Sequence, residues 1–342
     1  YPQLSFQNYD SDEYVMSVSD GEVDTGKPGT YEITYSVSPV SDARMYWHEK
    51  YTVNVTEKPA ESMGMKVVAD DNIIHATVTD ENGNGWFNGY YDNHGRPVEG
   101  KRDNHVRMML TGQVFSVMGN VADDAQTAAI IKSADLYLYK KEVGGYRLNT
   151  DFKEEKFDLG RMFGFAYGEK ENGAVFSHMT VMYANALYQR GFVKEGYRAL
   201  YTLLEQAMNT PVSLMYPGIP EYFDADGKGK YPYLTGAASW YMMTMVTQIF
   251  GFRGEWGDLV LEPKILLRQF DESGNYSAQF PFRGQTYAVV YQNPQKKEYG
   301  DYRITEVWLD GQRYAGETNT GICIPFAVLE GKENHTLRIV LG

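Results

Sequence analysis

The stretch that decides the fold runs from Phe192 to Asn209 and reads FVKEGYRALYTLLEQAMN. Its apolar residues recur at spacings of three and four, the period of a helix with one buried face. The stripe consists of Val193, Tyr197, Leu200, Tyr201, Leu204 and Met208. The spacing predicts an amphipathic helix that packs against other helices.

Neighbouring stretches on both sides of this helix are also helical in pattern. Residues 106–119 (VRMMLTGQVFSVMG) and 123–141 (DDAQTAAIIKSADLYLYKK) predict helices, the second with acidic residues at its start and lysines at its end. Residues 238–251 (ASWYMMTMVTQIFG) are apolar nearly all round, which predicts a buried helix ended by a glycine. Helices that alternate with long loops suggest stacked helical pairs, as in an α/α toroid.

The two ends of the chain have the alternating pattern of strands. Residues 30–37 (TYEITYSV) and 51–55 (YTVNV) predict strands, and residues 57–64 (EKPAESMG) suit a linker. Short strand patterns return near the C-terminus, where the pair Asp310-Gly311 predicts a hairpin. We therefore expect a multidomain α+β protein: a β segment at residues 1–58, a mainly helical domain at 61–265 and a β-sandwich at 266–342.

Composition excludes several classes of protein. The chain has 342 residues, a net charge of −13 and no run of Lys or Arg, so nucleic acid and acidic membranes are poor partners. Its single cysteine, Cys323, excludes an internal disulfide and a cysteine-based metal site. The 28 tyrosines suit sugar-binding surfaces, where a flat ring stacks on a pyranose, or equally a β-rich surface with many half-buried rings.

Polar residues gather in the stretch Gly164 to His178, GFAYGEKENGAVFSH. Lys170 and Glu171 precede Gly173, and His178 opens an apolar run that predicts a helix. A single histidine on an apolar helix face is often a core residue with satisfied hydrogen bonds, so this pattern alone leaves structural and functional interpretations open.

Two further stretches carry groups that could bind a ligand. Thr235 and Gly236 stand where the apolar helix begins, and free N–H groups at a helix N-terminus attract anions, although Thr235 could simply cap the helix. Residues 216–233 form a polar loop with Glu221 and the sequence DADG. A calcium-binding EF-hand loop that starts at Asp224 is excluded, because its twelfth position is Thr235 and an EF-hand requires a glutamate there.

In their order and spacing these motifs resemble a known family. The segments KENGAVFSH (170–178), YPGIPEYF (216–223), YLTGAASW (233–240) and GDLVLEPKI (257–265) resemble the C-terminal part of the cellobiose and cellodextrin phosphorylases of glycoside hydrolase family ninety-four. Upstream, GWFNGYYDNHGRPVEG (85–100) and LTGQVFSVMGNVADDAQTAAI (110–130) are similar to the same family. The resemblance covers roughly residues 62–342. Residues 1–58 are similar to immunoglobulin-like repeats of bacterial surface proteins.

The resemblance implies a fold and a reaction. Family members have an (α/α)6 barrel followed by a β-domain, are commonly dimers, and cleave β-glucosides with phosphate and inversion of configuration. It also implies roles for seven residues. The phosphate-binding residues would be His178, Thr235 and Gly236, and the sugar-binding residues Lys170, Glu171, Gln113 and Glu221. Inorganic phosphate would be a co-substrate, with no cofactor and no metal.

One departure from the family is decisive. The family's general acid is an aspartate in a Trp-Asn-Asp-Gly type motif, and none of the five tryptophans here is followed by Asn-Asp. The family's upstream phosphate-binding arginine also has no counterpart. We therefore expect a partial toroid and a phosphorylase-like chain that is inactive alone and needs a complementing chain or a homodimer.

Two alternatives remain open: a non-catalytic carbohydrate-binding protein and a structural helical scaffold. The sequence does not decide the substrate among β-glucan oligosaccharides. It leaves the location open as well: cytoplasmic by the phosphorylase resemblance, or extracellular if the immunoglobulin-like segment is a surface module.

Overall fold

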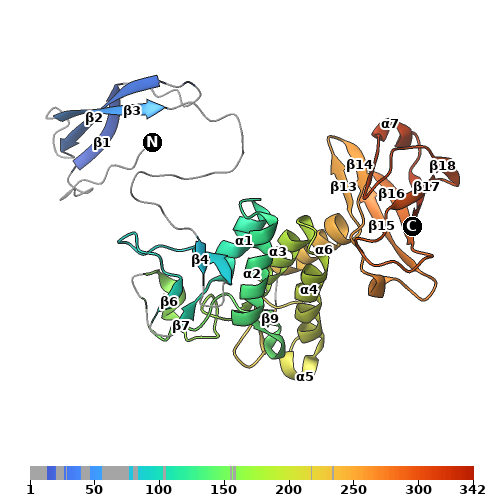
Figure 1. Ribbon diagram of the computed structural model, residues 1–342, viewed down its shortest axis with the longest axis horizontal. Coiled ribbons are helices and arrows are strands. Elements are labelled where there is room, and N and C mark those ends of the chain that lie inside the picture. Colours follow the sequence, from blue (N-terminus) through green and yellow to red (C-terminus); the bar gives the residue numbers. More distant parts are fainter. Residues whose placement is uncertain are drawn as a thin grey trace. The chain divides into compact units, whose positions relative to one another are not determined.

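The chain divides into two units, Tyr1–Met65 and Lys66–Gly342 (Figure 1). The computed structural model describes residues 14–20, 27, 29–39, 47–55, 77–79, 84–102, 105–154, 156, 159–216, 218–232 and 235–342. The linker expected at residues 57–64 lies outside these described residues. Helices and sheets both occur, so the expected mixture of the two is confirmed.

The first unit contains a three-stranded antiparallel sheet. Its strands are β1 (Tyr14–Asp20), β2 (Gly29–Pro39) and β3 (Trp47–Val55), with β2 in the middle. The strands expected at residues 30–37 and 51–55 are confirmed as parts of β2 and β3. Ile33 of β2 is buried, as the alternating pattern requires.

The second unit contains helices packed around one central helix, α3 (Ser177–Gln189). They are α1 (Leu110–Met118), α2 (Asp124–Tyr137), α3, α4 (Val193–Met208), α5 (Thr210–Ser213) and α6 (Gly236–Thr244), and a π-helix, η4 (Met245–Ile249), continues α6. Helix α3 packs against α1, α4 and α6 (Figure 1). Its residues 180–188 are therefore all buried.

Three sequence expectations about these helices have clear outcomes. Helix α4 is confirmed with the bounds that its apolar stripe indicates. The helix expected at residues 123–141 is confirmed as α2 but ends earlier, so the expectation of lysines at its end is wrong: Lys140 lies in β8 and Lys141 in η1. Helix α2 begins at a capping box, in which Asp123 accepts from the Gln126 N–H and the Gln126 side chain accepts from the Asp123 N–H. The expectation that α6 is buried all round is wrong, because Met242 and Met243 on this helix are exposed.

Short strands and turns connect the helices. They are β4 (Thr77–Thr79), β5 (Gly85–Phe87), β6 (Gly100–Arg102), β7 (His105–Arg107), β8 (Tyr139–Lys140), η1 (Lys141–Val143), β9 (Gly145–Tyr146), η3 (Arg161–Gly164), β10 (Val175–Phe176), β11 (Tyr222–Phe223) and β12 (Gly229–Lys230). Strand β11 pairs with both β10 and β12. This small sheet joins the polar stretch before α3 to the polar loop before α6.

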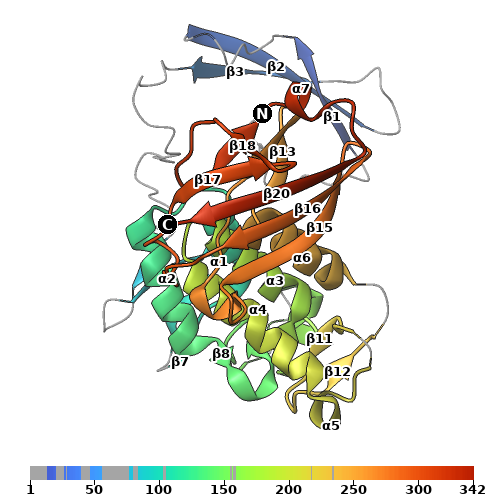
Figure 2. The same cartoon turned by 90° about the vertical axis from the view of Figure 1, so that its right-hand side faces the viewer.

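Two sheets follow the helices. The first contains β13 (Phe252–Glu255), β14 (Asp258–Leu261) and β19 (Ile322–Ile324). The second has the order β15 (Asn275–Phe282), β16 (Gln285–Gln292), β20 (Asn334–Leu341), β17 (Ile304–Leu309) and β18 (Gln312–Tyr314), as Figure 2 shows. The turn η5 (Leu267–Gln269) and the helix α7 (Phe326–Leu329) lie between strands. A single cluster of buried apolar residues runs from the helices into these sheets.

The hairpin expected at Asp310-Gly311 is confirmed. Leu309 pairs with Gln312, and both turn residues have positive φ, 52° for Asp310 and 83° for Gly311. These values suit a two-residue turn that matches the twist of the strands.

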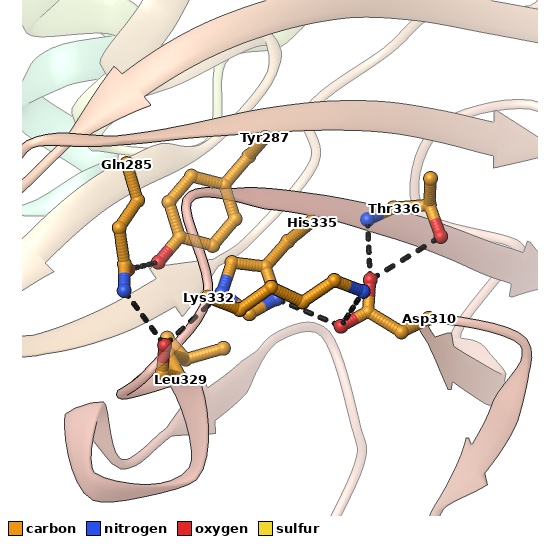
Figure 3. A network of polar contacts seen from close by, with 7 residues as sticks. All are labelled: Gln285, Tyr287, Asp310, Leu329, Lys332, His335 and Thr336. Carbon is orange, nitrogen blue, oxygen red and sulfur yellow. Dashed lines mark hydrogen bonds and ion pairs between the residues drawn. The ribbon is translucent and has the colours of Figure 1, made fainter.

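The Asp310 carboxylate also organises the adjacent edge of the sheet (Figure 3). It forms an ion pair with Lys332 at 2.8 Å and lies 2.9 Å from Nδ1 of the buried His335. The other ring nitrogen of His335 lies 3.0 Å from the Leu329 carbonyl, to which Gln285 also donates. The network therefore ties the end of α7 to β16 and β20.

No helix in the described part of the second or first unit is long and apolar enough to cross a bilayer.

Candidate functional site

Two helix N-termini meet at one corner of the second unit. Gly236 is the first residue of α6, and His178 lies in the first turn of α3. A Cβ atom built on Gly236 would lie 2.6 Å from Cε1 of His178, so backbone and ring are in direct contact. The first N–H groups of a helix have no partner within it, and the helix dipole adds partial positive charge. Their convergence makes this corner suited to an oxyanion.

Two other side chains at this corner point to the same use, whereas Thr235 acts as the cap of α6. Its hydroxyl accepts from the Ala237 N–H at 3.2 Å, so that N–H group already has a partner. Nε2 of His178 and the hydroxyl of Ser177 are buried without a hydrogen-bond partner. Burial lowers the pKa of His178, which favours a neutral ring that can donate one hydrogen bond. Buried polar groups usually have partners, so these two at one helix start are available to bind a ligand.

The polar stretch before α3 forms a tight loop next to this corner. Asn172 accepts from the Asn149 side chain at 3.0 Å and donates to the Phe165 carbonyl at 2.7 Å. Asn149 in turn accepts from the Gly173 N–H at 2.7 Å. Gly173 has φ of 75°, and the Tyr167 ring would overlap any Cβ atom there. Asn149 is a supporting residue that sequence reasoning missed, since it lies more than twenty positions upstream.

The Lys170 side chain extends over an aromatic pair. Its Nζ lies 3.7 Å from the centre of the Tyr231 ring and 5.9 Å from that of Tyr222. A hydrogen bond with Tyr231 is the main cause that raises the pKa of Lys170, and the nearby Glu221 carboxylate adds to it. Lys170 and Tyr231 both have positive φ, 49° and 56°. Such conformations are uncommon for residues with bulky side chains and cluster at functional sites.

Glu171 faces a cavity of about 320 Å³. One of its carboxylate oxygens lies 3.2 Å from the Arg161 guanidinium, and the other is buried with no partner. The cavity is mostly apolar, with Tyr90 and Thr111 as further polar residues and Phe176 and Met179 from the β10–α3 segment. An apolar cavity with a few convergent polar groups is the usual form of a small-molecule site.

A second carboxyl group, Glu99, lies behind the wall of this cavity. It is buried and accepts from the Gly89 N–H at 2.7 Å and from the Met109 N–H at 2.8 Å. Burial raises its pKa to about 8, despite these two hydrogen bonds. A Cβ atom on Gly89 would lie 2.8 Å from Gly112, so the two backbones touch in front of the carboxyl. Glu99 stands near the end of the stretch GWFNGYYDNHGRPVEG, but the sequence analysis assigned it no role.

Gln113 does not line the cavity, although the preceding residues Thr111 and Gly112 do. It is fully buried, its Nε2 donates to the Phe87 and Met109 carbonyls, and its Oε1 accepts from the Phe87 N–H. These bonds join α1 to β5 and occupy the whole amide group. The structure therefore does not bring Gln113 together with the other expected sugar-binding residues.

Glu221 lies on the hairpin that carries Tyr222. Its carbonyl accepts from the Ser177 N–H at 2.9 Å, so the hairpin is joined to the start of α3. The tip of the hairpin is fixed by Asp224, whose Oδ1 accepts from the N–H groups of Asp226 and Lys228, each at 2.9 Å. The DADG sequence is thus a side-chain-stabilised turn. Among the described residues there is no group of three or more His, Cys, Asp or Glu that could hold a metal ion.

The sequence of this region is similar to known proteins. The family model described as "Glycosyl hydrolase 94 superfamily, catalytic domain" matches residues 43–251. Solabiose phosphorylase from Paenibacillus borealis is 23% identical over 240 residues, which cover 68% of this chain and 30% of that protein. Cellobionic acid phosphorylase from Neurospora crassa is 26% identical over 214 residues, 58% of this chain and 26% of that protein.

A third relative is N,N'-diacetylchitobiose phosphorylase from Vibrio proteolyticus, 24% identical over 230 residues, which cover 65% of this chain and 28% of that protein. In all three cases the matched segment spans less than a third of the relative's length.

Proposed function

This chain belongs to the glycosyl hydrolase 94 superfamily, and from that membership we propose that it is a phosphorylase-like protein for inorganic phosphate and a β-linked sugar. The observation that carries the proposal is the contact between His178 and Gly236 at two helix N-termini. A cavity that contains Glu171 supplies space for a sugar. The relatives described above are phosphorylases of disaccharides, which supports the pairing of the two ligands.

We assign the phosphate to His178, Thr235 and Gly236. The N–H groups at the start of α6 and one ring nitrogen of His178 would donate to its oxygens. Lys170 and Glu171, with Glu221 on the neighbouring hairpin, would bind sugar hydroxyls. Gln113 enters this assignment only as a support of α1, because its amide is used by the backbone.

The reaction that fits these ligands is inverting phosphorolysis. A phosphate oxygen forms a bond to the anomeric carbon while the bond to the glycosidic oxygen breaks, giving an α-sugar 1-phosphate. The leaving oxygen takes a proton from a carboxylic acid. Glu171 is paired with Arg161, and Glu99 lies behind the glycine wall, so neither is placed as that acid. We therefore propose that the acid comes from a complementing chain.

The fold supports an incomplete assembly. We propose that residues 61–265 form part of an (α/α)6 toroid, with a β-sandwich at 266–342 and an immunoglobulin-like segment at 1–58. Helices α1 and α6 flank α3, and each leaves apolar side chains exposed, Phe115 at 52% and Met242 at 60%. A complementing chain or a second copy would cover these faces. Light scattering that shows a clean monomer at high concentration would count against an exposed apolar face and against a second copy as the partner.

A non-catalytic carbohydrate-binding protein is the second candidate. The absence of the family's Trp-Asn-Asp-Gly type motif from the sequence favours it, because the sugar side of the site would then serve binding alone. In this case glycan affinity would not depend on phosphate.

Calorimetric titration with inorganic phosphate tests the proposed anion site. His178→Ala should weaken binding by about 10-fold or more, since a hydrogen bond to a charged group contributes about 1.5–3 kcal/mol. His94→Ala is the matched control, because His94 is exposed and lies in the turn after β5. Equal phosphate affinity in the two variants would remove the basis of the proposal.

A further inference from the structure

Four tyrosines line an open cavity that shares no residue with the cavity of Glu171. It has a volume of about 260 Å³ and lies where α4, α6 and η4 meet the C-terminal sheets. Tyr197 and Tyr201 come from α4, Tyr241 from α6 and Tyr276 from β15. The lining residues Tyr241, Met245 and Ile249 stand about 7, 13 and 20 Å from Gly236 along the helix, at about 1.5 Å per residue. The cavity therefore lies beside the second half of α6 and η4, whereas the proposed phosphate site lies at the N-terminus of α6.

The rings of Tyr197 and Tyr201 are stacked on each other on a partly exposed face of α4. They are one helical turn apart, their centres lie 5.4 Å from each other, and their planes differ by 15°. Tyr201 is 36% exposed, although it stands in the apolar stripe of α4. The partly exposed pair offers an apolar ring face to a ligand.

Polar donors stand at the rim of this surface. The Arg268 guanidinium lies 5.2 Å from the centre of the Tyr197 ring and 5.3 Å from that of Tyr201. Within the described part of the chain Arg268 forms no ion pair, although the chain carries an excess of acidic residues. Gln269 and the hydroxyl groups of Tyr241 and Tyr276 add further hydrogen-bonding groups. Burial raises the pKa of Tyr241 to about 12, so its hydroxyl keeps its proton.

We propose that this cavity is a second carbohydrate-binding site that takes one pyranose unit of an oligosaccharide. A pyranose has an apolar C–H face and a rim of hydroxyl groups. The C–H face is attracted by the negative face of an aromatic ring, as a cation is, and the hydroxyl groups pair with arginine and amide donors. The volume is slightly below the range of about 300–1,000 Å³ typical of drug-sized ligands, which suits a single ring.

The site goes beyond the proposed phosphorylase function, since it shares no residue with the groups assigned to phosphate or to the reacting sugar. Its effect would be to hold a distant part of a longer glycan. The gain in affinity then comes from effective concentration, because one chain of sugars contacts the protein at two places.

Titration with cellohexaose and with chitohexaose, in buffer without phosphate, tests the proposal. The double variant Tyr197→Ala/Tyr201→Ala should bind the better of the two glycans about 10-fold more weakly than the wild type. Tyr216→Ala is the matched control, because Tyr216 is 89% exposed and lies outside this cavity. Arg268→Gln, a change at an exposed residue, should weaken binding several-fold without any risk to the core.

Melting of each variant, followed by circular dichroism, distinguishes a loss of binding from a loss of folding. If the double tyrosine variant is unfolded, the glycan affinity of Arg268→Gln tests the proposal. Phosphate affinity should be unchanged in Arg268→Gln, which distinguishes this site from the proposed phosphate site. The proposal is overturned if all variants bind as the wild type does. It is equally overturned if the wild type binds neither glycan, or if Glu171→Gln alone abolishes all glycan binding.

Discussion

Replacing Gly236 by alanine is the most direct way to disturb the corner where α3 and α6 meet. The added Cβ would lie 2.6 Å from Cε1, 2.7 Å from Nδ1 and 3.1 Å from Nε2 of His178. Comfortable contacts between carbon atoms are about 3.5–4.0 Å. The imidazole ring must therefore move by about 1 Å or more. The Trp240 ring, whose centre lies 5.7 Å from that of His178, restricts the direction of this movement.

Two effects on stability oppose each other in Gly236→Ala. Alanine is favoured over glycine in a helix by at most about 1 kcal/mol, and less at a first position. Overpacking typically costs about 1–3 kcal/mol. The variant should thus be destabilised by about 1–2 kcal/mol. Phosphate affinity should fall by at least about 10-fold, because the His178 ring is displaced from the first N–H groups of α6.

Calorimetric phosphate titration and thermal melting of the same samples measure both quantities. The matched control is Gly164→Ala, since a Cβ atom at Gly164 would meet no atom within 4 Å. This control should match the wild type in both measurements. If Gly236→Ala binds phosphate as tightly as Gly164→Ala does, the corner is not the anion site.

Three further predictions concern other groups. Thr235→Ala should lower the free energy of unfolding by about 1 kcal/mol through loss of the helix cap, whereas Thr235→Ser should keep it, as thermal melting would show. The pKa of Glu99 is raised to about 8 from 4.5, so the stability from this group is complete below pH 4.5 and is lost as the pH rises through about 8. Between these two pH values, the free energy of unfolding measured with denaturant should fall by up to about 1.4 kcal/mol per pH unit. This fall should be absent in Glu99→Gln. For Asp310, burial raises the pKa, but bonds from Lys332, Thr336 and His335 outweigh this and lower it to about 2. The stability that Asp310 contributes should therefore be present above pH 3.8 and lost as the pH falls through about 2. Acid unfolding of Asp310→Asn should lack this loss. An equal loss in the variant would show that other groups cause it.

The helices with a single apolar face could be predicted from the sequence. The stripe of α4 fixed its bounds, because tertiary packing agrees with the local pattern there. Helix α6 shows the limit of such reasoning. Its sequence lacks charged residues and predicts a buried helix, yet Met242 is exposed. The apolar pattern shows which faces of a helix avoid water, but it does not show whether the same chain covers them.

The candidate site was predictable only in part. His178 and Gly236 lie in contact, which fits what the family resemblance implied. The two helix starts are recognisable from sequence, but the local patterns alone do not predict that they meet. The buried Glu99 and the supporting Asn149 were not predictable, since their environments are made by residues distant in the sequence. Gln113 fits a backbone role that its motif did not distinguish from sugar binding.

We propose that the chain binds phosphate beside a sugar and needs a carboxylic acid from another chain to react. Phosphorus-31 nuclear magnetic resonance of the protein with phosphate and cellodextrins tests this most directly, because one spectrum reports both bound phosphate and any sugar 1-phosphate. We predict a phosphate line that broadens with added wild-type protein but not with His178→Ala, and no sugar 1-phosphate line. A sugar 1-phosphate line that grows at an enzymatic rate, or a phosphate line unaffected by the wild type, would contradict the account.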